Sequence, residues 1–155
     1  MKKFFRAQIL QPVLLCLWLI FIFGNSLRTG DASNEQSIQT LHSLEDFFAL
    51  FQISVLLEHG LLRQMAHFAE FFLLGALTVW GVLLFRKEQR IYLLFGVLFC
   101  IGASVIDETI QYFVPGRAMS FVDMTLDTLG GICGFFGTLL FWKLFLHIQQ
   151  KRKRT

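Results

Sequence analysis

The sequence predicts an all-α membrane protein, a four-helix transmembrane bundle with an additional interfacial or re-entrant helix between helices one and two. The first observation is composition: of 155 residues, 55% are hydrophobic and 19 are phenylalanine, and the mean hydropathy is +0.59, far from a soluble average. The others are four separate apolar runs and a single long connection between the first two. We predict one integral membrane domain over residues 1–155, with spans at roughly residues 9–26, 66–85, 91–112 and 122–146.

The first span is the shortest of the four. Its apolar part covers only residues 9–23, whereas roughly 20 residues are needed to cross about 30 Å of hydrocarbon. Its flanks must therefore complete the crossing. Pro12 suits the first turn of this helix, where a missing amide donor costs little. Because Asn25 and Ser26 belong to a poor signal-peptide cleavage site, we predict that the helix is not cleaved.

The connection at residues 27–64 is predicted to contain two parts. Residues 29–39 are polar and carry no periodicity, so we expect an exposed, mobile loop. Residues 44–57 are apolar again, and Ser43 and Asp46 have the spacing of a helix capping box. Fourteen residues are too few to cross a bilayer, so this segment is predicted to be an interfacial or re-entrant helix.

Short connections join the remaining spans. The basic segment at residues 86–90 makes the second and third spans an antiparallel hairpin. Residues 114–117, with the sequence Val-Pro-Gly-Arg, join the third span to the fourth. Proline fixes φ and glycine supplies a positive φ, which predicts a type II turn.

The fourth span combines two carboxylates with a row of glycines. Asp123 and Asp127 occupy its first turns, followed by Gly130, Gly134 and Gly137. Small residues let helix backbones approach closely, so this span is predicted to lie centrally against its neighbours. The carboxylates could also be ordinary interfacial caps that the helix dipole favours, and that alternative stays open.

Basic residues flank alternate ends of the spans. Cytoplasmic flanks are enriched in Lys and Arg, so both termini are predicted to be cytoplasmic. All acidic residues except Glu88, 10 of 11, then lie on the outer side or in the outer half of the membrane. The net charge of +3 is therefore a topology signal, and the basic tail is expected to bind anionic lipid headgroups, not nucleic acid. Of 14 basic residues, 11 fall on the cytoplasmic side: Lys2, Lys3, Arg6, Arg86, Lys87, Arg90, Lys143, Lys151, Arg152, Lys153 and Arg154.

Every span also carries polar residues at its predicted outer end. A charge at the centre of a membrane helix costs about 2.5 to 3.5 kcal/mol and indicates a functional site by default. We therefore predict one polar site near the outer leaflet, built by all four spans. Its predicted ligand-binding residues are Asn25, Ser26, Arg63, His67, Glu70, Asp107, Glu108, Gln111, Arg117, Asp123 and Asp127.

Less specific explanations of these residues stay open. His67 and Glu70, three residues apart on one helix face, could form a purely structural pair. Asp107 and Glu108 point about 100° apart on a helix, so we expect only one of them to enter the site. A structural ion-pair network that includes Arg117 could account for the whole set. Since no metal-ligand spacing is diagnostic, we predict no metal and no cofactor.

Three blocks of the sequence resemble the VanZ-like family, membrane proteins associated with teicoplanin resistance. The first two are Asn25 with Ser26 and the segment AHFAEF at residues 66–71, in which Phe71 replaces the usual tyrosine of the family. The resemblance implies a multi-pass protein of the bacterial cytoplasmic (inner) membrane, sometimes linked to glycopeptide resistance, with no settled molecular activity. The third and most specific block comprises Asp107, Glu108, Gln111, Phe113, Pro115, Gly116, Arg117, Asp123, Asp127 and Gly130.

Three hypotheses about function follow. The leading one is a binding protein for a cell-envelope lipid, a lipid-linked wall precursor or a glycopeptide, in which Arg63 and Arg117 contact anionic groups. The second is a membrane-embedded hydrolase or transferase acting on the same molecules, with His67 as general base assisted by Glu70 or Glu108. The third is a small transporter or scaffold, which would act as a homo-oligomer. The sequence leaves open whether the protein is an enzyme.

Overall fold

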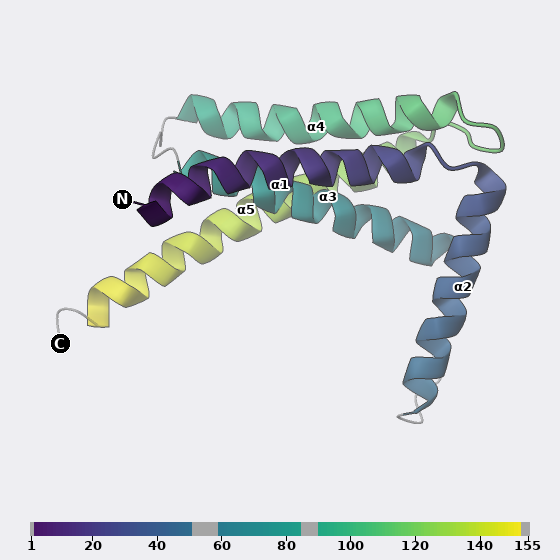
Figure 1. Ribbon diagram of the computed structural model, residues 1–155, viewed down its shortest axis with the longest axis horizontal. Coiled ribbons are helices and arrows are strands. Elements are labelled where there is room, and N and C mark those ends of the chain that lie inside the picture. Colours follow the sequence, from purple (N-terminus) through teal and green to yellow (C-terminus); the bar gives the residue numbers. More distant parts are fainter. Residues whose placement is uncertain (1, 51–58, 85–89, 153–155) are drawn as a thin grey trace.

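A computed structural model describes residues 2–50, 59–84 and 90–152 (Figure 1). Over these ranges the chain forms five helices and no strand, and four of the helices are long and apolar enough to cross a membrane. The predicted all-α class with four candidate spans is therefore confirmed. The helices are α1 (Lys2–Ser26), α2 (Gly30–Ala49), α3 (His59–Leu84), α4 (Arg90–Tyr112) and α5 (Phe121–Arg152).

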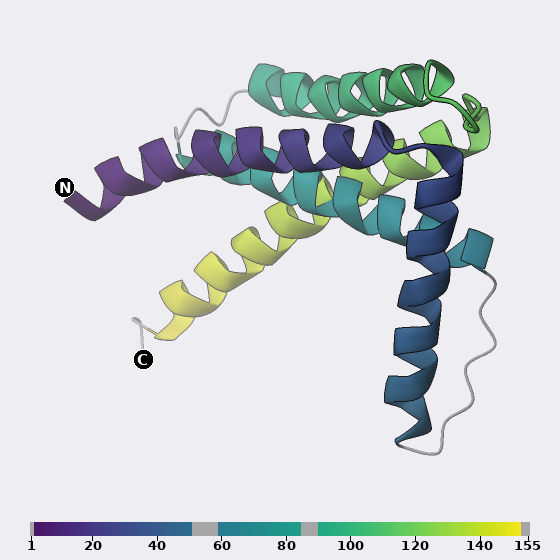
Figure 2. The same cartoon turned by 45° about the vertical axis from the view of Figure 1, so that its right-hand side comes forward.

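The four long helices alternate in direction, as consecutive crossings require. α1 and α4 run one way and α3 and α5 run the other, so both chain termini lie at one end of the bundle (Figures 1 and 2). We call the opposite end the α2 end, because α2 leaves the bundle there. At the α2 end, α1 and α4 finish while α3 and α5 begin.

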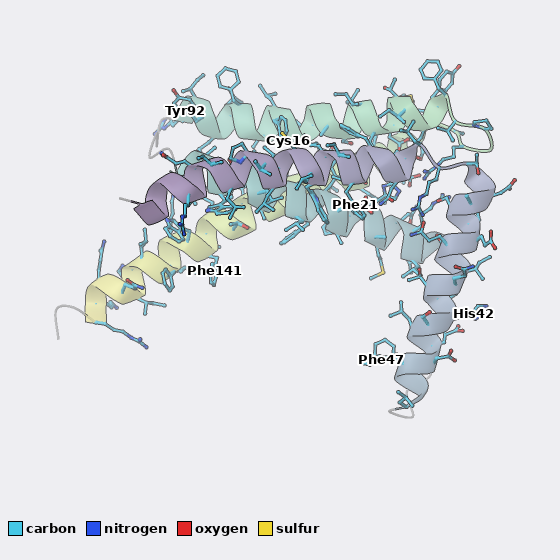
Figure 3. The ribbon with its side chains drawn as sticks, viewed as in Figure 1. Cys16, Phe21, His42, Phe47, Tyr92 and Phe141 are labelled. Atoms are coloured by element: carbon cyan, nitrogen blue, oxygen red, sulfur yellow. The ribbon has the colours of Figure 1, made fainter. Side chains whose placement is uncertain are left out.

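The outer surface of the bundle is apolar. Phe21 on α1 and Phe141 on α5 are 47% and 70% exposed (Figure 3), and many aliphatic side chains on the same helices are exposed to a similar degree. Contiguous apolar surface of this extent is not tolerated by soluble monomers. Such a surface fits helices that are surrounded by lipid. Helices are also suited to lipid because each one satisfies its own backbone hydrogen bonds.

The helices extend beyond the predicted spans into polar sequence. α3 begins at His59 instead of residue 66, and α5 continues to Arg152 instead of residue 146. The apolar run marks only the part of a helix that crosses hydrocarbon, whereas backbone hydrogen bonding continues into polar flanks. The early start of α3 places Arg63 on the same helix as His67. The predicted hairpin connection lies largely outside the described residues.

The predicted mobile loop at residues 29–39 is wrong, because this stretch forms the first half of α2. The side chain of Thr29 caps the helix by accepting a hydrogen bond from the amide of Ala32 (3.4 Å). One turn further along the helix, the Arg28 guanidinium donates a hydrogen bond to the side chain of Gln36. An apolar stripe is the usual sequence signal of a helix, and here a cap and polar contacts stabilise a helix without one.

The predicted capping box at Ser43 is also wrong. The Ser43 hydroxyl donates to the carbonyl of Gln39 (2.9 Å), so it lies inside α2 and not at its start. The predicted helix at residues 44–57 is the continuation of α2 as far as Ala49, and residues 51–58 lie outside the description. α2 runs across the direction of the bundle (Figures 1 and 2), the orientation expected of a helix lying along a membrane surface.

The predicted type II turn between α4 and α5 is confirmed. The amide of Arg117 donates to the carbonyl of Val114 (3.1 Å), and Gly116 has a φ of +74°. The start of α2 packs against this turn, since the amide of Gly30 donates to the carbonyl of Pro115 (3.1 Å). A Cβ on Gly30 would lie only 2.0 Å from the Gly116 carbonyl oxygen. The connection from α1 to α2 and the connection from α4 to α5 therefore pack against each other. This contact fixes the backbone of Arg117.

α5 packs chiefly against α3, at the predicted glycines. A Cβ on Gly134 would lie 1.8 Å from the carbonyl oxygen of Phe72, and one on Gly130 would lie 2.5 Å from that of Phe68. These distances require glycine, which confirms the predicted close approach. Gly137 is different, because a Cβ there meets nothing within 4 Å.

α1 packs against α3 and α4. The indole nitrogen of Trp18 donates to the backbone carbonyl of Glu70 (2.9 Å), which ties the middle of α1 to the first half of α3. This contact places Asn25 and Ser26 beside the polar ends of α3 and α4. The buried apolar cluster at this contact comprises Ile22, Phe71, Leu74 and Ala103.

We predict that Gly134→Ala lowers the free energy of unfolding by about 1–3 kcal/mol, the usual cost of overpacking, because the methyl group would meet the Phe72 carbonyl. Gly137→Ala is the matched control on the same helix and should raise stability by at most about 1 kcal/mol through helix propensity. Thermal unfolding in detergent, followed by tryptophan fluorescence, measures both. Equal unfolding midpoints for the two variants would contradict this contact between α3 and α5.

Candidate functional site

A group of buried polar side chains lies at the α2 end, and we call it the polar cluster. Its members come from all four long helices, as the sequence analysis expected. Each is fully or nearly fully buried except His67, whose side chain is 16% exposed. The polar cluster comprises Ser26, His67, Asp107, Glu108, Gln111 and Asp127.

Asp107 on α4 holds two other members of the cluster. Its Oδ1 accepts a hydrogen bond from the hydroxyl of Ser26 (2.5 Å), and its Oδ2 accepts one from the amide of Gln111 (2.8 Å). The Ser26 contact joins the end of α1 to α4, and the Gln111 contact lies one helical turn along α4. Two donors therefore fix the orientation of this fully buried carboxylate.

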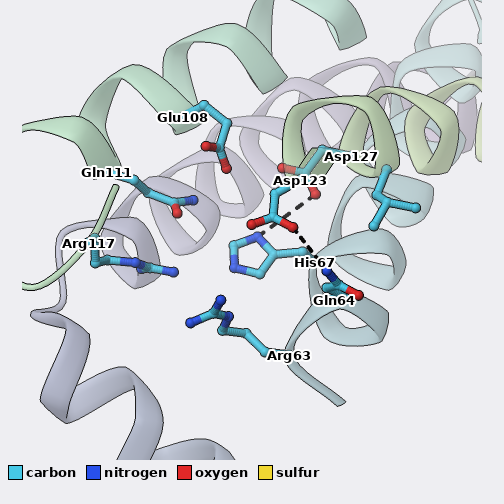
Figure 4. A pocket seen from close by; sticks show the side chains of 9 residues that line it. Arg63, Gln64, His67, Glu108, Gln111, Arg117, Asp123 and Asp127 are labelled. Atoms are coloured by element: carbon cyan, nitrogen blue, oxygen red, sulfur yellow. Dashed lines mark hydrogen bonds and ion pairs between the residues drawn. The ribbon is translucent and has the colours of Figure 1, made fainter. Parts of the chain in front are cut away.

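His67 on α3 lies between two buried carboxylates, of which Figure 4 shows that of Asp127. Its Nδ1 is 3.9 Å from Oδ2 of Asp107 on α4 and 3.9 Å from Oδ1 of Asp127 on α5. Both distances are too long for hydrogen bonds. Among the described residues, Nδ1 of His67 and both carboxylate oxygens of Asp127 have no hydrogen-bond partner.

The predicted partnership of His67 with Glu70 is not what the structure shows. Oε1 of Glu70 accepts a hydrogen bond from the side-chain amide of Asn25 (3.0 Å), so this carboxylate turns toward α1. The carboxylates next to His67 belong to Asp107 and Asp127 instead. Spacing along α3 puts His67 and Glu70 on neighbouring positions of one face, but contacts with other helices decide where each side chain points.

Asp107 and Glu108 are both fully buried, so the expectation that only one of them enters the site is wrong. Oε2 of Glu108 accepts a hydrogen bond from the backbone amide of Ser120 (2.7 Å). The connection from α4 to α5 folds back along this side of α4. The side of α4 that carries Glu108 therefore faces protein and not lipid headgroups.

Asp123 and Asp127 differ in environment. Asp123 lies in the first turn of α5 and is half-buried, and its Oδ1 accepts a hydrogen bond from the side-chain amide of Gln64 (3.3 Å). The interfacial-cap explanation fits this residue. It fails for Asp127, which is fully buried one turn further along the helix.

The serine hydroxyls near the polar cluster all have structural partners. Ser26 donates to Asp107, and Ser104 donates to the backbone carbonyl of Met124 (2.8 Å). The Ser120 hydroxyl accepts a hydrogen bond from the amide of Asp123 (3.2 Å), as an N-cap residue does. None of these three hydroxyls is placed as a free nucleophile.

Two clefts open beside the polar cluster. The inner cleft, of about 10 Å³, has room for roughly one water molecule. The outer cleft, of about 120 Å³, lies between α2 and α3. Arg63, His67 and Arg117 line both clefts, so they form the wall between them. Figure 4 shows the side chains of Arg63 and Arg117 reaching toward the His67 ring from the side opposite Asp127.

Within the described part of the chain, neither arginine of this wall has a carboxylate partner. Over the described ranges, no acidic oxygen lies within 4.0 Å of Arg63 or Arg117. The polar contact of Arg117 is a long hydrogen bond from Nη1 to the backbone carbonyl of Asn25 (3.4 Å). Burial, and then the charge of Arg63, lower the pKa of Arg117 from its usual value. The guanidinium stays charged at neutral pH, because an arginine pKa starts above about 12.

Several residues that line the clefts were not among those predicted from the sequence. Gln64 lies three residues before His67 on α3, so helical spacing alone could have identified it. The α2 residues of the outer cleft gave no such signal, because the helix that carries them was predicted to be a loop. They are Ser33, Gln36, Ser37 and Thr40.

The two sides of the wall differ in the charge of their side chains. On the inner side are buried carboxylates with unused oxygens, which suit a cation or a proton. On the outer side are two guanidinium groups, which suit phosphate or carboxylate groups. Among the described residues, His67, Asp107 and Asp127 form a group of potential metal ligands, whose ligand atoms all lie within 4.8 Å of one another.

Comparison with known proteins identifies the family. The family model described as VanZ/LLP1 matches residues 12–145, which include α3, α4, most of α1 and α5, and every residue of the polar cluster. No curated protein and no solved structure matches the chain. Four membrane-length helices and a match over most of the chain agree with the resemblance in the sequence blocks, and the chain belongs to the VanZ/LLP1 family.

Proposed function

We propose that this protein binds a cell-envelope lipid, a lipid-linked wall precursor or a glycopeptide at the outer face of the bacterial cytoplasmic membrane. Arg63 and Arg117 would bind the anionic group of this ligand. Through this binding the protein would contribute to glycopeptide (teicoplanin) resistance. The observation that carries the proposal is that neither Arg63 nor Arg117 has an acidic partner among the described residues, although buried carboxylates lie in the same end of the bundle.

Two neighbouring guanidinium groups repel one another unless an anion lies between them. Arg63 contributes to the lowered pKa of Arg117, which is the sign of such repulsion. Arginine binds phosphate and carboxylate groups through two parallel hydrogen bonds, and these are among the strongest in proteins. A bound anion would therefore relieve the repulsion and satisfy donors that have no acidic partner among the described residues.

The outer cleft offers neutral polar groups next to the arginines. It is lined by hydroxyl and amide side chains of α2 and by Asn25 at the end of α1, whose amide holds the carboxylate of Glu70 in the same lining. Hydroxyl and amide groups both donate and accept hydrogen bonds, as recognition of sugar hydroxyls requires. A headgroup that joins a phosphate to a glycan fits this combination of side chains better than a phosphate alone.

The proposed outward orientation rests on charge. The end of the bundle opposite the polar cluster carries the basic flanks of the chain, including Arg90 at the start of α4 and Lys151 at the end of α5. Because cytoplasmic flanks are enriched in basic residues, both termini are proposed to be cytoplasmic and the clefts to face outward.

We predict that a single cysteine at Asn34 is labelled by a membrane-impermeant maleimide in intact cells, whereas one at Gln150 is labelled only after permeabilisation. Both positions are exposed. The native cysteines at positions 16, 100 and 133 would first be replaced. The reverse labelling pattern would overturn the proposed orientation.

We predict that Arg63→Gln and Arg117→Gln each weaken binding of an isoprenyl pyrophosphate about tenfold, equivalent to about 1.4 kcal/mol and at the low end for a hydrogen bond to a charged group. Arg6→Gln, at the opposite end of the bundle, is the control and should bind as the wild type does. Native mass spectrometry of the detergent-solubilised protein, titrated with the lipid, measures the affinity.

An isoprenol without phosphate separates headgroup binding from tail binding. The arginine variants should bind it as well as the wild type does. If the folded double variant kept both its pyrophosphate affinity and the teicoplanin susceptibility of the cells that carry it, headgroup binding by these arginines would be refuted.

A second candidate function is hydrolysis or group transfer on the same class of molecule. It is favoured by the position of His67 beside two buried carboxylates and by Glu108, whose Oε1 is buried without a hydrogen-bond partner among the described residues. Both side chains line the inner cleft. Release of phosphate from an isoprenyl pyrophosphate, abolished in His67→Ala and Glu108→Gln, would support it, and stable binding without turnover in the presence of divalent ions would exclude it.

A further inference from the structure

We propose that His67, Asp107 and Asp127 bind a divalent transition-metal ion, Zn²⁺ or Mn²⁺, in the polar cluster. The proposal goes beyond headgroup binding and does not depend on it. The ligand atoms would be Nδ1 of His67, Oδ2 of Asp107 and Oδ1 of Asp127. They come from α3, α4 and α5, so no spacing within one segment of the sequence could indicate them.

The distances between these atoms fit ligands of one ion and do not fit hydrogen bonds. Nδ1 of His67 is 3.9 Å from each carboxylate oxygen, and each of the three residues offers a ligand atom within 4.8 Å of those of the other two. Zinc bonds to nitrogen and oxygen are about 2.0 to 2.2 Å long, so two ligand atoms of a tetrahedral zinc ion lie about 3.3 to 3.6 Å apart. Shifts of a few tenths of an ångström would complete the coordination.

The hydrogen bonding of His67 and Asp127 indicates a site for a ligand. Asp127 is fully buried, and neither of its oxygens has a donor in the part of the chain that the structure describes. The same holds for Nδ1 of His67. Buried polar groups without partners are rare in proteins and call for a specific explanation. One ion would satisfy both Nδ1 of His67 and Oδ1 of Asp127.

Charge gives a further reason. Asp107 and Asp127 are both 0% exposed, and no lysine or arginine of the described ranges lies within 4.0 Å of either. Burying an uncompensated carboxylate is costly, and buried carboxylates are generally paired or bound to metals. A protonated His67 would be a poor counterion, since 3.9 Å is beyond hydrogen-bond length. A dication between the two carboxylates balances both.

The surroundings of Asp107 resemble those of a metal ligand. Metal-binding side chains are usually held by hydrogen bonds from outside the ligand set, and Asp107 accepts such bonds from Ser26 and Gln111. The inner cleft, with room for about one water molecule, borders His67 and Asp127. This arrangement of three protein ligands and one open position is that of exchangeable, not purely structural, metal sites. The nitrogen ligand favours Zn²⁺ or Mn²⁺ over Ca²⁺ or Mg²⁺, which prefer oxygen ligands alone.

The test is metal content and affinity of the full chain, purified through a tag without histidines. Inductively coupled plasma mass spectrometry should find about one transition-metal ion per chain after dialysis against Zn²⁺ or Mn²⁺. Addition of the metal to chelator-treated protein should raise its unfolding temperature, because an ion that binds only the folded state stabilises it. Asp127→Asn and His67→Gln should lose both effects.

Controls and graded variants make the test specific. Glu70→Gln changes a neighbouring carboxylate outside the ligand set and should keep wild-type metal affinity. Ser26→Ala removes one bond to Asp107 and should weaken affinity about 10- to 100-fold. If His67→Gln fails to fold, the isosteric Asp127→Asn still decides. Wild-type protein without bound transition metal and without metal-induced stabilisation would overturn the proposal, as would an Asp127→Asn variant with unchanged affinity or stabilisation by Ca²⁺ or Mg²⁺ alone.

Metal content also separates this proposal from headgroup binding. Arg63→Gln and Arg117→Gln should retain the ion while losing affinity for the isoprenyl pyrophosphate. If these variants lost lipid binding and the wild type held no metal, the proposal of headgroup binding would stand and only the proposed metal site would be refuted.

Discussion

The close approach of α3 and α5 is the constraint on which the rest of the structure depends. The Phe68 carbonyl faces the missing side chain of Gly130, and one helical turn closer to the α2 end the same two helices place His67 beside Asp127. A larger residue at Gly130 or Gly134 would push the two helices apart directly beneath the polar cluster. Helix packing in lipid relies on such small residues because no hydrophobic effect drives helices together there. The glycines therefore serve both the stability of the bundle and the geometry of the site.

The polar cluster is costly for a membrane protein to maintain, and this cost argues for a role beyond structure. Asp107, Glu108 and Asp127 are fully buried, yet among the described residues only Asp107 has a hydrogen-bond donor for each of its two oxygens. A network optimised for stability would satisfy every member, since partly satisfied polar networks are less favourable than an apolar core. Unused oxygens of Glu108 and Asp127 are instead left next to the inner cleft. Departures of this kind from local consistency are typical of functional sites.

Much of the fold could be predicted from the sequence, because hydrocarbon imposes length and composition on each span. The type II turn at Gly116 and the close approach at Gly134 were also predictable, since each requires a particular residue. The first half of α2 was not, because a polar helix without an apolar stripe looks like a loop. In the candidate site, helical spacing indicated which residues reach the α2 end but not their partners. The separation of His67 from Glu70 and the burial of both Asp107 and Glu108 depend on neighbouring helices and on the connection before α5.

The division of charge across the wall suggests how the two proposed sites would affect each other. Without a cation, the buried carboxylates repel any anion that approaches Arg63 and Arg117, and part of the attraction of the arginines is lost. A divalent ion bound by His67, Asp107 and Asp127 would neutralise the charge of these two carboxylates on the inner side of the wall, at a distance where charges in low dielectric interact strongly. Binding of the metal and of the headgroup would then favour one another. Such coupling is reciprocal. The factor by which the metal raises the affinity for an anionic ligand must therefore equal the factor by which that ligand raises the affinity for the metal. His67, which lines both clefts and lies between the two carboxylates, is the residue through which this coupling would act.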